Sequence, residues 1–210
     1  IHDVAEGSMY SVHMVQHLLY TLIAAPLLLM GTPGWMMRLV LPGPLMRIVR
    51  WWSRFLPAIV LFNVMIVVTH WPAVVDLALR SGLFHFVIHA ALLLSAFVIW
   101  MPLLPRLTAP MKMVFLFLQS VVPTVPATFL TFGSRPLYRR YEQFPKLWGF
   151  TALNDQLIAG LIMKIGAGLF IWAIIAVIFF RWAASEELRN RPDRALREMD
   201  RELIDMGLRK

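Results

Sequence analysis

Apolar residues follow one another along this chain in long runs, with polar residues confined to the breaks between them. A helix that crosses a bilayer needs roughly 20 mainly apolar residues, because it rises about 1.5 Å per residue through a hydrocarbon core of about 30 Å. Five runs are long enough, at about residues 9–30, 55–71, 83–104, 111–132 and 153–182. The pattern therefore predicts an all-α protein, a polytopic transmembrane helix bundle with five spans visible.

Helix-breaking residues mark the ends of these runs. The letters GTPG follow the first run, HWP ends the second and MPLLP ends the third. The fourth run contains Pro123 and Pro126, and each proline removes a helical hydrogen bond, so a kink is expected there.

Two segments outside the runs are also expected to be helical. Residues 42–55 read PGPLMRIVRWWSRF, and a mixture of arginine and tryptophan suits a short helix in the lipid headgroup region. Residues 185–210 are charged, with a narrow apolar stripe at helical spacing. We divide the chain into a bundle at 1–184 and a charged cytoplasmic tail at 185–210.

Composition agrees with a membrane protein. Hydrophobic residues make up 59% of the 210 residues and charged residues 15%, whereas soluble domains carry roughly 25% charged residues. Cysteine is absent, which excludes disulfides, thiolate metal sites and thiol catalysis. The net charge of +8 comes from basic residues that flank the apolar runs and form no continuous stripe, so no nucleic-acid partner is predicted.

Lysine and arginine are distributed unequally between the two sides of the predicted bundle. Fourteen lie in the first-to-second loop, the third-to-fourth loop and the chain from Arg181 onward, against five in the alternate loops, of which residues 133–152 hold four. Basic loops remain in the cytoplasm, so the N-terminus is expected outside the membrane and the C-terminus on its cytoplasmic side.

Histidines and other polar residues gather at the predicted outer ends of the spans. Histidines four apart on one helix project from the same face, so each of the two pairs can aim both rings at one point. Intramembrane polar groups usually face the bundle interior. The candidate site comprises His13, His17, His70, His85 and His89, with Asp155 and Gln156 at the start of the fifth span.

This set of side chains favours copper. Imidazole binds copper, zinc, iron and nickel, and a thioether from Met9 or Met163 would shift the preference toward Cu(I). Asp155 and Gln156 are expected to orient ligands by hydrogen bonds to a ring, although Asp155 also suits a helix N-terminus. A zinc hydrolase is disfavoured because HExxH is absent. The alternative is a b-type haem redox protein with one axial histidine from each pair.

Three motifs together resemble one protein family. They are YSVHMVQHLLYTLIAAPLLLMGTP, then HWP followed by HFVIHA, then LNDQLIAGLIM. In order and spacing they resemble the CtaG-type cytochrome c oxidase assembly factors, which are polytopic bacterial membrane proteins. The likeness covers about residues 1–185, and the five histidines, Asp155 and Gln156 match the motif residues of that family.

The resemblance implies a non-enzymatic factor that matures haem–copper terminal oxidases by binding or delivering copper at the periplasmic face. Oxidase subunits or other copper chaperones would be its partners. Such proteins usually have about seven spans, so one or two further N-terminal spans are expected. Lys164 departs from the family pattern, because an aromatic residue is expected at this position.

The predicted orientation is testable with a reporter that is active only in the periplasm. Fused after Val74, between the second and third spans, it should be active, and fused after Lys210 it should be silent. The opposite pattern would place the histidines on the cytoplasmic face.

Overall fold

The first span is one helix of 22 residues with an irregular middle. The computed structural model describes residues 9–104, 107–144 and 149–206, and it contains no strand within these ranges. The span comprises α2 (Tyr10–Leu18), the π-helical turn η1 (Leu19–Ala24) and α3 (Ala25–Gly31). It ends at the predicted GTPG break.

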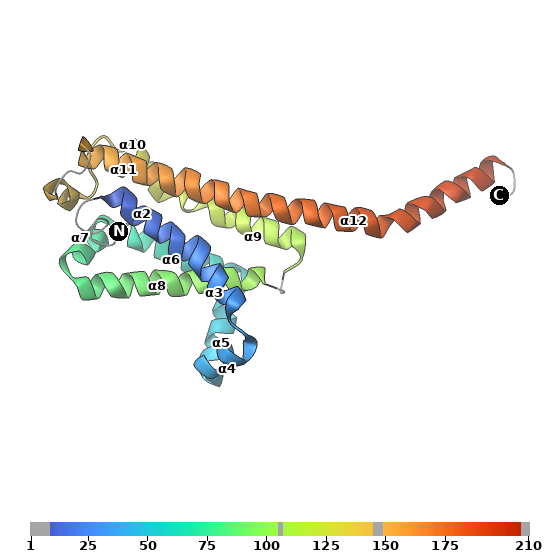
Figure 1. Ribbon diagram of the computed structural model, residues 1–210, viewed down its shortest axis with the longest axis horizontal. Coiled ribbons are helices and arrows are strands. Elements are labelled where there is room, and N and C mark those ends of the chain that lie inside the picture. Colours follow the sequence, from blue (N-terminus) through green and yellow to red (C-terminus); the bar gives the residue numbers. More distant parts are fainter. Residues whose placement is uncertain (1–8, 105–106, 145–148, 207–210) are drawn as a thin grey trace.

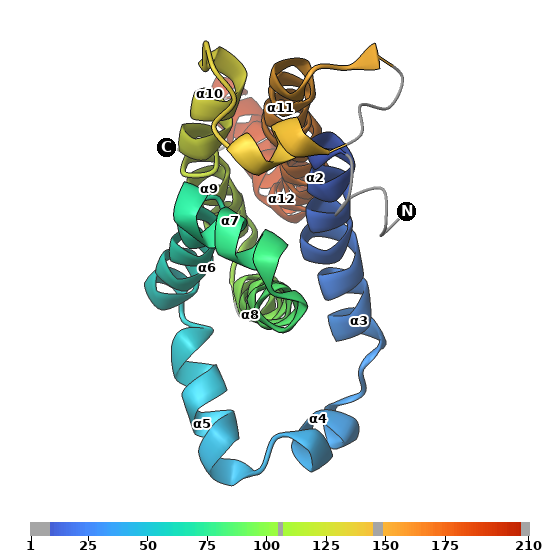
Figure 2. The same ribbon diagram turned by 90° about the vertical axis from the view of Figure 1, so that its left-hand side faces the viewer.

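The second span is shorter than a bilayer is thick. Its helix α6 (Phe55–Thr69) has 15 residues, or about 22 Å at 1.5 Å per residue. Before it, α5 (Gly43–Trp52) meets α6 at an angle of 85°. Together with α4 (Gly34–Val40), α5 projects sideways from the bundle, as a helix in the headgroup plane should (Figure 1, Figure 2).

The third and fourth spans follow after the short helix α7 (Pro72–Arg80). The third is α8 (Gly82–Trp100), extended by the 3₁₀ turn η2 (Met101–Leu103). The fourth is divided into α9 (Ala109–Val121) and α10 (Thr124–Phe132). The break between them includes Pro123, as the prolines predicted.

The last span is the longest. After the 3₁₀ turn η3 (Arg139–Gln143) come α11 (Ala152–Leu161), a second π-helical turn η5 (Ile162–Gly166) and α12 (Ala167–Asp205). Figure 1 shows α12 continuing far beyond the other helices, with the charged tail as its outer part. By length and composition, the described chain has four helices that can cross a membrane, or five if the bent pair α5–α6 counts as one.

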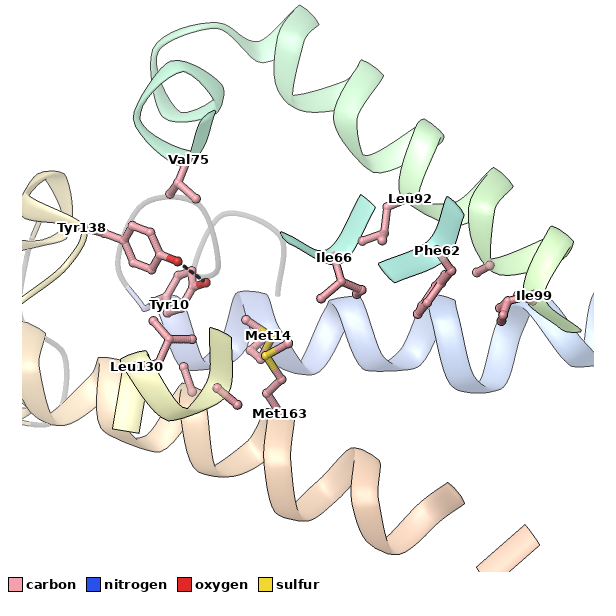
Figure 3. Packing of buried hydrophobic residues seen from close by; sticks show 14 of the residues in the cluster. Tyr10, Met14, Phe62, Ile66, Val75, Leu92, Ile99, Leu130, Tyr138 and Met163 are labelled. Carbon is pink, nitrogen blue, oxygen red and sulfur yellow. Dashed lines mark hydrogen bonds between the residues drawn. The ribbon is translucent and has the colours of Figure 1, made fainter. Parts of the chain in front are cut away.

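Contacts between spans join segments that are distant in sequence. Helix α2 packs on α11, α11 on α10, and α12 along α9, while α8 lies between α3 and α6 (Figure 2). Buried side chains such as Met14, Phe62 and Leu92 fill the centre of the bundle (Figure 3). Many large apolar side chains, including Phe86, Phe129 and Phe180, are exposed on the outside, as lipid contact requires. The chain is a multi-pass membrane protein.

Gly160 allows the close approach of α10 and α11. A Cβ atom at this position would lie 2.9 Å from the backbone nitrogen of Thr131 and 3.0 Å from the carbonyl oxygen of Ala127. Both neighbours are backbone atoms that cannot move aside without shifting a helix. The absence of a side chain at Gly160 therefore permits close packing of the two helices.

We therefore expect Gly160→Ala to destabilise the fold by about 1–3 kcal/mol, the usual cost of overpacking. Thermal unfolding in mild detergent should show a lower midpoint. Gly168→Ala is the matched control, because a Cβ there meets nothing within 4 Å. Equal midpoints for the two variants would contradict the close packing.

Candidate metal centre

The first histidine pair is held in place by the start of α2. Met9 precedes the helix in extended conformation, and its carbonyl oxygen accepts a hydrogen bond from the backbone N–H of His13, at 3.3 Å. His13 and His17 follow one turn apart and are both buried. Their ring centroids lie 4.4 Å apart, so the two imidazoles form one surface on α2.

The second pair is held by the start of α8. Ser81 caps this helix, since its hydroxyl accepts from the backbone N–H of Phe84 at 3.3 Å and its carbonyl accepts from that of His85 at 2.9 Å. The ring centroids of His85 and His89 lie 4.1 Å apart. This geometry presents both rings toward α2.

The two pairs meet inside the bundle. Nitrogens of His13, His85 and His89 lie within 4.8 Å of one another. The Nε2 atoms of His17 and His89 lie 3.0 Å apart. Two nitrogens that bind one ion at about 2.0–2.1 Å lie no more than about 4.2 Å apart, so small ring rotations would bring the three nitrogens onto one ion.

His70 lies beside this cluster but is not part of its closest group. It follows the last residue of α6, and its ring centroid is 6.1 Å from that of His17. Its Nδ1 lies 2.7 Å from the carbonyl oxygen of Ile66. Its backbone carbonyl accepts a hydrogen bond from the hydroxyl of Tyr138 at 2.8 Å. The structure thus brings all five predicted histidines to one end of the bundle.

Asp155 contacts the helix that carries the first pair, and not a histidine ring. Its carboxylate accepts from the backbone N–H of Tyr10 at 2.6 Å, from that of Ser11 at 3.1 Å, and from the Ser11 hydroxyl. We expected Asp155 to bond to a histidine ring. It bonds to the start of α2 because its carboxylate faces the positive end of that helix dipole. Asp155 therefore positions His13 and His17 through the backbone.

Gln156 also bonds to backbone and not to a histidine. Its side-chain oxygen accepts from the backbone N–H of Leu137 at 2.5 Å, and its amide donates to the carbonyl of Leu130 at 3.2 Å. It thereby connects α11 to the loop that carries Tyr138. Gln156 was also expected to contact a histidine ring, and it bonds to the backbone of Leu137 and Leu130 instead.

The two candidate thioether residues have different surroundings. Met9 is buried at the N-terminal end of α2. Met163 is buried on η5 in the interior of the bundle. It lines a separate cavity together with Met14, His17 and His70.

Sequence reasoning missed a group of tyrosines at the site. The ring of Tyr10 stacks near His13, with centroids 6.1 Å apart, and its hydroxyl donates to that of Tyr138 at 3.3 Å. Burial raises the pKa of Tyr138 to about 12, so its phenol stays neutral and can donate to His70. The position of Tyr10, three residues before His13 on the same helix face, was the available signal.

The cavity between the pairs is small and uncharged. It has a volume of about 20 Å³ and is lined by four of the histidines, by Tyr141, by Thr69 at the end of α6 and by apolar side chains of α7 and α8. Of the described residues, no carboxylate lines it. The chemistry available here is coordination by neutral nitrogen atoms.

The sequence model of the cytochrome c oxidase caa3 assembly factor family, Caa3_CtaG, matches residues 1–185. The chain belongs to this family. The matched region contains every histidine of the cluster, Asp155 and Gln156, and it ends within α12 near the start of the charged tail. Comparisons with curated proteins and with solved structures find no match. Membership makes this multi-pass protein a cytochrome c oxidase assembly factor.

The role of Asp155 can be tested by hydrogen exchange. Asp155→Asn removes the charge and turns an amide NH₂ toward one of the two backbone N–H groups. The free energy of local opening at the start of α2 should therefore fall by about 1–2 kcal/mol. A peptide containing Tyr10 and Ser11 should then exchange faster. Asn154→Ala, at the exposed neighbouring position, is the control and should leave the exchange unchanged. Equal exchange in both variants would contradict the positioning role.

Proposed function

We propose that this assembly factor binds copper, as Cu(I), between α2 and α8 and supplies it to a haem–copper oxidase without catalysing a reaction. The ligands are His13, His17, His85 and His89. The observation that supports the proposal most strongly is the convergence of three nitrogens, from His13, His85 and His89, within 4.8 Å. These residues come from two helices that are more than 60 residues apart in the sequence.

The charge of the site favours a monovalent ion. Desolvating an ion costs free energy that grows with the square of its charge, and a buried carboxylate usually offsets that cost for divalent metals. Among the residues that the structure describes, Asp155 is the acidic side chain that contacts the start of α2, and it is already bonded to Tyr10 and Ser11. Neutral imidazoles therefore suit Cu(I) better than Zn²⁺ or Cu²⁺.

The proposed location is the periplasmic face. At the other end of the first span, α4 and α5 bring Arg38, Arg47 and Arg50 to one shared pocket. No acidic residue occurs between Glu6 and Asp76, so these guanidinium groups form a strongly positive surface. Positive loops stay in the cytoplasm, and the histidines at the opposite end of the span are then outside.

The geometry does not favour the haem alternative. Cofactor pockets measure roughly 300–1,000 Å³, whereas the cavity between the two pairs has about 20 Å³. A macrocycle would also have to enter between Nε2 of His17 and Nε2 of His89, which are 3.0 Å apart. Direct contact between the rings leaves room for an ion and none for a porphyrin.

A Cu(I) competition titration of the purified protein tests the proposal. The unmodified protein should hold copper, and the double variants His13→Ala/His17→Ala and His85→Ala/His89→Ala should each bind at least about 100-fold more weakly at this site. Thr32→Ala, at the far end of the first span, is the control. A visible absorption spectrum is recorded on the same samples.

Two results would contradict the proposal. One is copper binding of equal strength in all variants, and the other is a Soret band, which indicates haem. In cells that lack this protein, the double variants should also fail to restore copper-loaded oxidase, whereas the Thr32→Ala control should restore it.

A further inference from the structure

His17 separates two cavities of different chemistry. The outer cavity, described above, contains the four paired histidines. The inner cavity has a volume of about 70 Å³ and lies deeper in the bundle, with His17 in its wall as well. His70 lines the inner cavity and not the outer one.

The ring of His70 is oriented with one nitrogen available to bind a ligand. A carbonyl oxygen can only accept, so the contact of 2.7 Å with the carbonyl of Ile66 requires the proton to be on Nδ1. Nε2 then carries a lone pair. This atom is buried and has no hydrogen-bond partner among the described residues. A buried, unpaired acceptor is costly, and metal coordination would satisfy it.

Two thioethers lie in the same cavity. Figure 3 shows Met14 from α2 and Met163 from η5 pointing toward one another. The exposed fractions of these side chains are 1% and 4%. Thioether sulfur is a soft, neutral ligand that prefers Cu(I) to zinc or to Cu²⁺.

Three backbone irregularities of the spans border this cavity. Thr21 and Leu22 come from η1, Met163 and Lys164 from η5, and Pro123 from the break between α9 and α10. π-Helical turns are rare in proteins, and those that occur often lie at functional sites. Because several irregular turns border the same cavity, we interpret the cavity as a functional feature of the fold and not as a packing defect.

We propose that the inner cavity is a second Cu(I) site, with Nε2 of His70 and the sulfur atoms of Met14 and Met163 as ligands. The proposal rests on the proposed function, because the copper comes from the outer histidines. His17 touches both cavities, so it can exchange the ion between them. Copper stays Cu(I) throughout, and only neutral ligands are exchanged, so no electron or proton donor is needed.

The charge around this cavity also suits a monovalent ion. Among the described residues that line this cavity, Lys164 alone has a formal charge, and its side chain is exposed. The amide of Gln119, which lines the cavity, accepts a hydrogen bond from Asn63 through its oxygen at 3.1 Å. A site with neutral ligands and a nearby ammonium group excludes a divalent ion more strongly than Cu(I).

The test measures how many Cu(I) ions the full chain binds in mild detergent, together with copper X-ray absorption. The unmodified protein should bind two equivalents and show sulfur as well as nitrogen neighbours. His70→Asn/Met163→Leu should bind one equivalent, without the sulfur signal. Asparagine retains a donor for the Ile66 carbonyl, and leucine nearly conserves the volume of methionine, so the fold should persist.

The outer and inner sites can fail separately in this experiment. Met65→Leu on α6 is the matched control, because this methionine lines neither cavity, and it should keep two equivalents. His13→Ala/His85→Ala should lose the outer equivalent and retain the sulfur signal. One equivalent in the unmodified protein, insensitive to His70→Asn/Met163→Leu, would overturn the inner site and leave the proposed function standing. No bound copper at all would overturn both.

Discussion

The bond between Asp155 and the start of α2 is the interaction on which the candidate site depends. A buried carboxylate near the membrane is expensive, and here two backbone N–H groups and a hydroxyl compensate for its lost hydration. The positive end of the helix dipole adds to this stabilisation. The contact fixes the first span against the fifth, and with it the height of His13 and His17 relative to α8.

Once α2 is fixed, the histidine cluster is held by groups outside the cluster itself. Ser81 starts α8, Tyr138 holds the backbone of His70, and Gln156 holds the loop that carries Tyr138. Asp155 and Gln156 bond to backbone groups, so among the described residues the cavity between the histidine pairs is lined by no carboxylate.

Irregular backbone on three spans borders the inner cavity. Regular helices with apolar faces would pack closely and leave no cavity. The π turns η1 and η5 and the break at Pro123 change the direction of side chains on three spans. Met163 lies on η5, so one of these turns places its side chain in the cavity that Met14 and His70 also line.

The amino-acid sequence by itself determined the helices, because apolar runs of membrane length leave the backbone no other way to satisfy its hydrogen bonds. It also placed the two histidine pairs on single helix faces, since residues four apart must share a face. The prolines predicted the break in the fourth span, and the family motifs predicted oxidase assembly, which the family match confirms. The inferences about the helices, the histidine faces and the proline break need only local geometry.

Only the tertiary structure decided which polar groups meet. The roles of Asp155 and Gln156 depend on contacts across 145 and 19 residues of sequence, and neither contact has a local signal. The division of the histidines into a cluster of four and a separate His70 depends on where α6 ends relative to α2. Helix packing sets these distances, and packing depends on the shapes of side chains from every span at once.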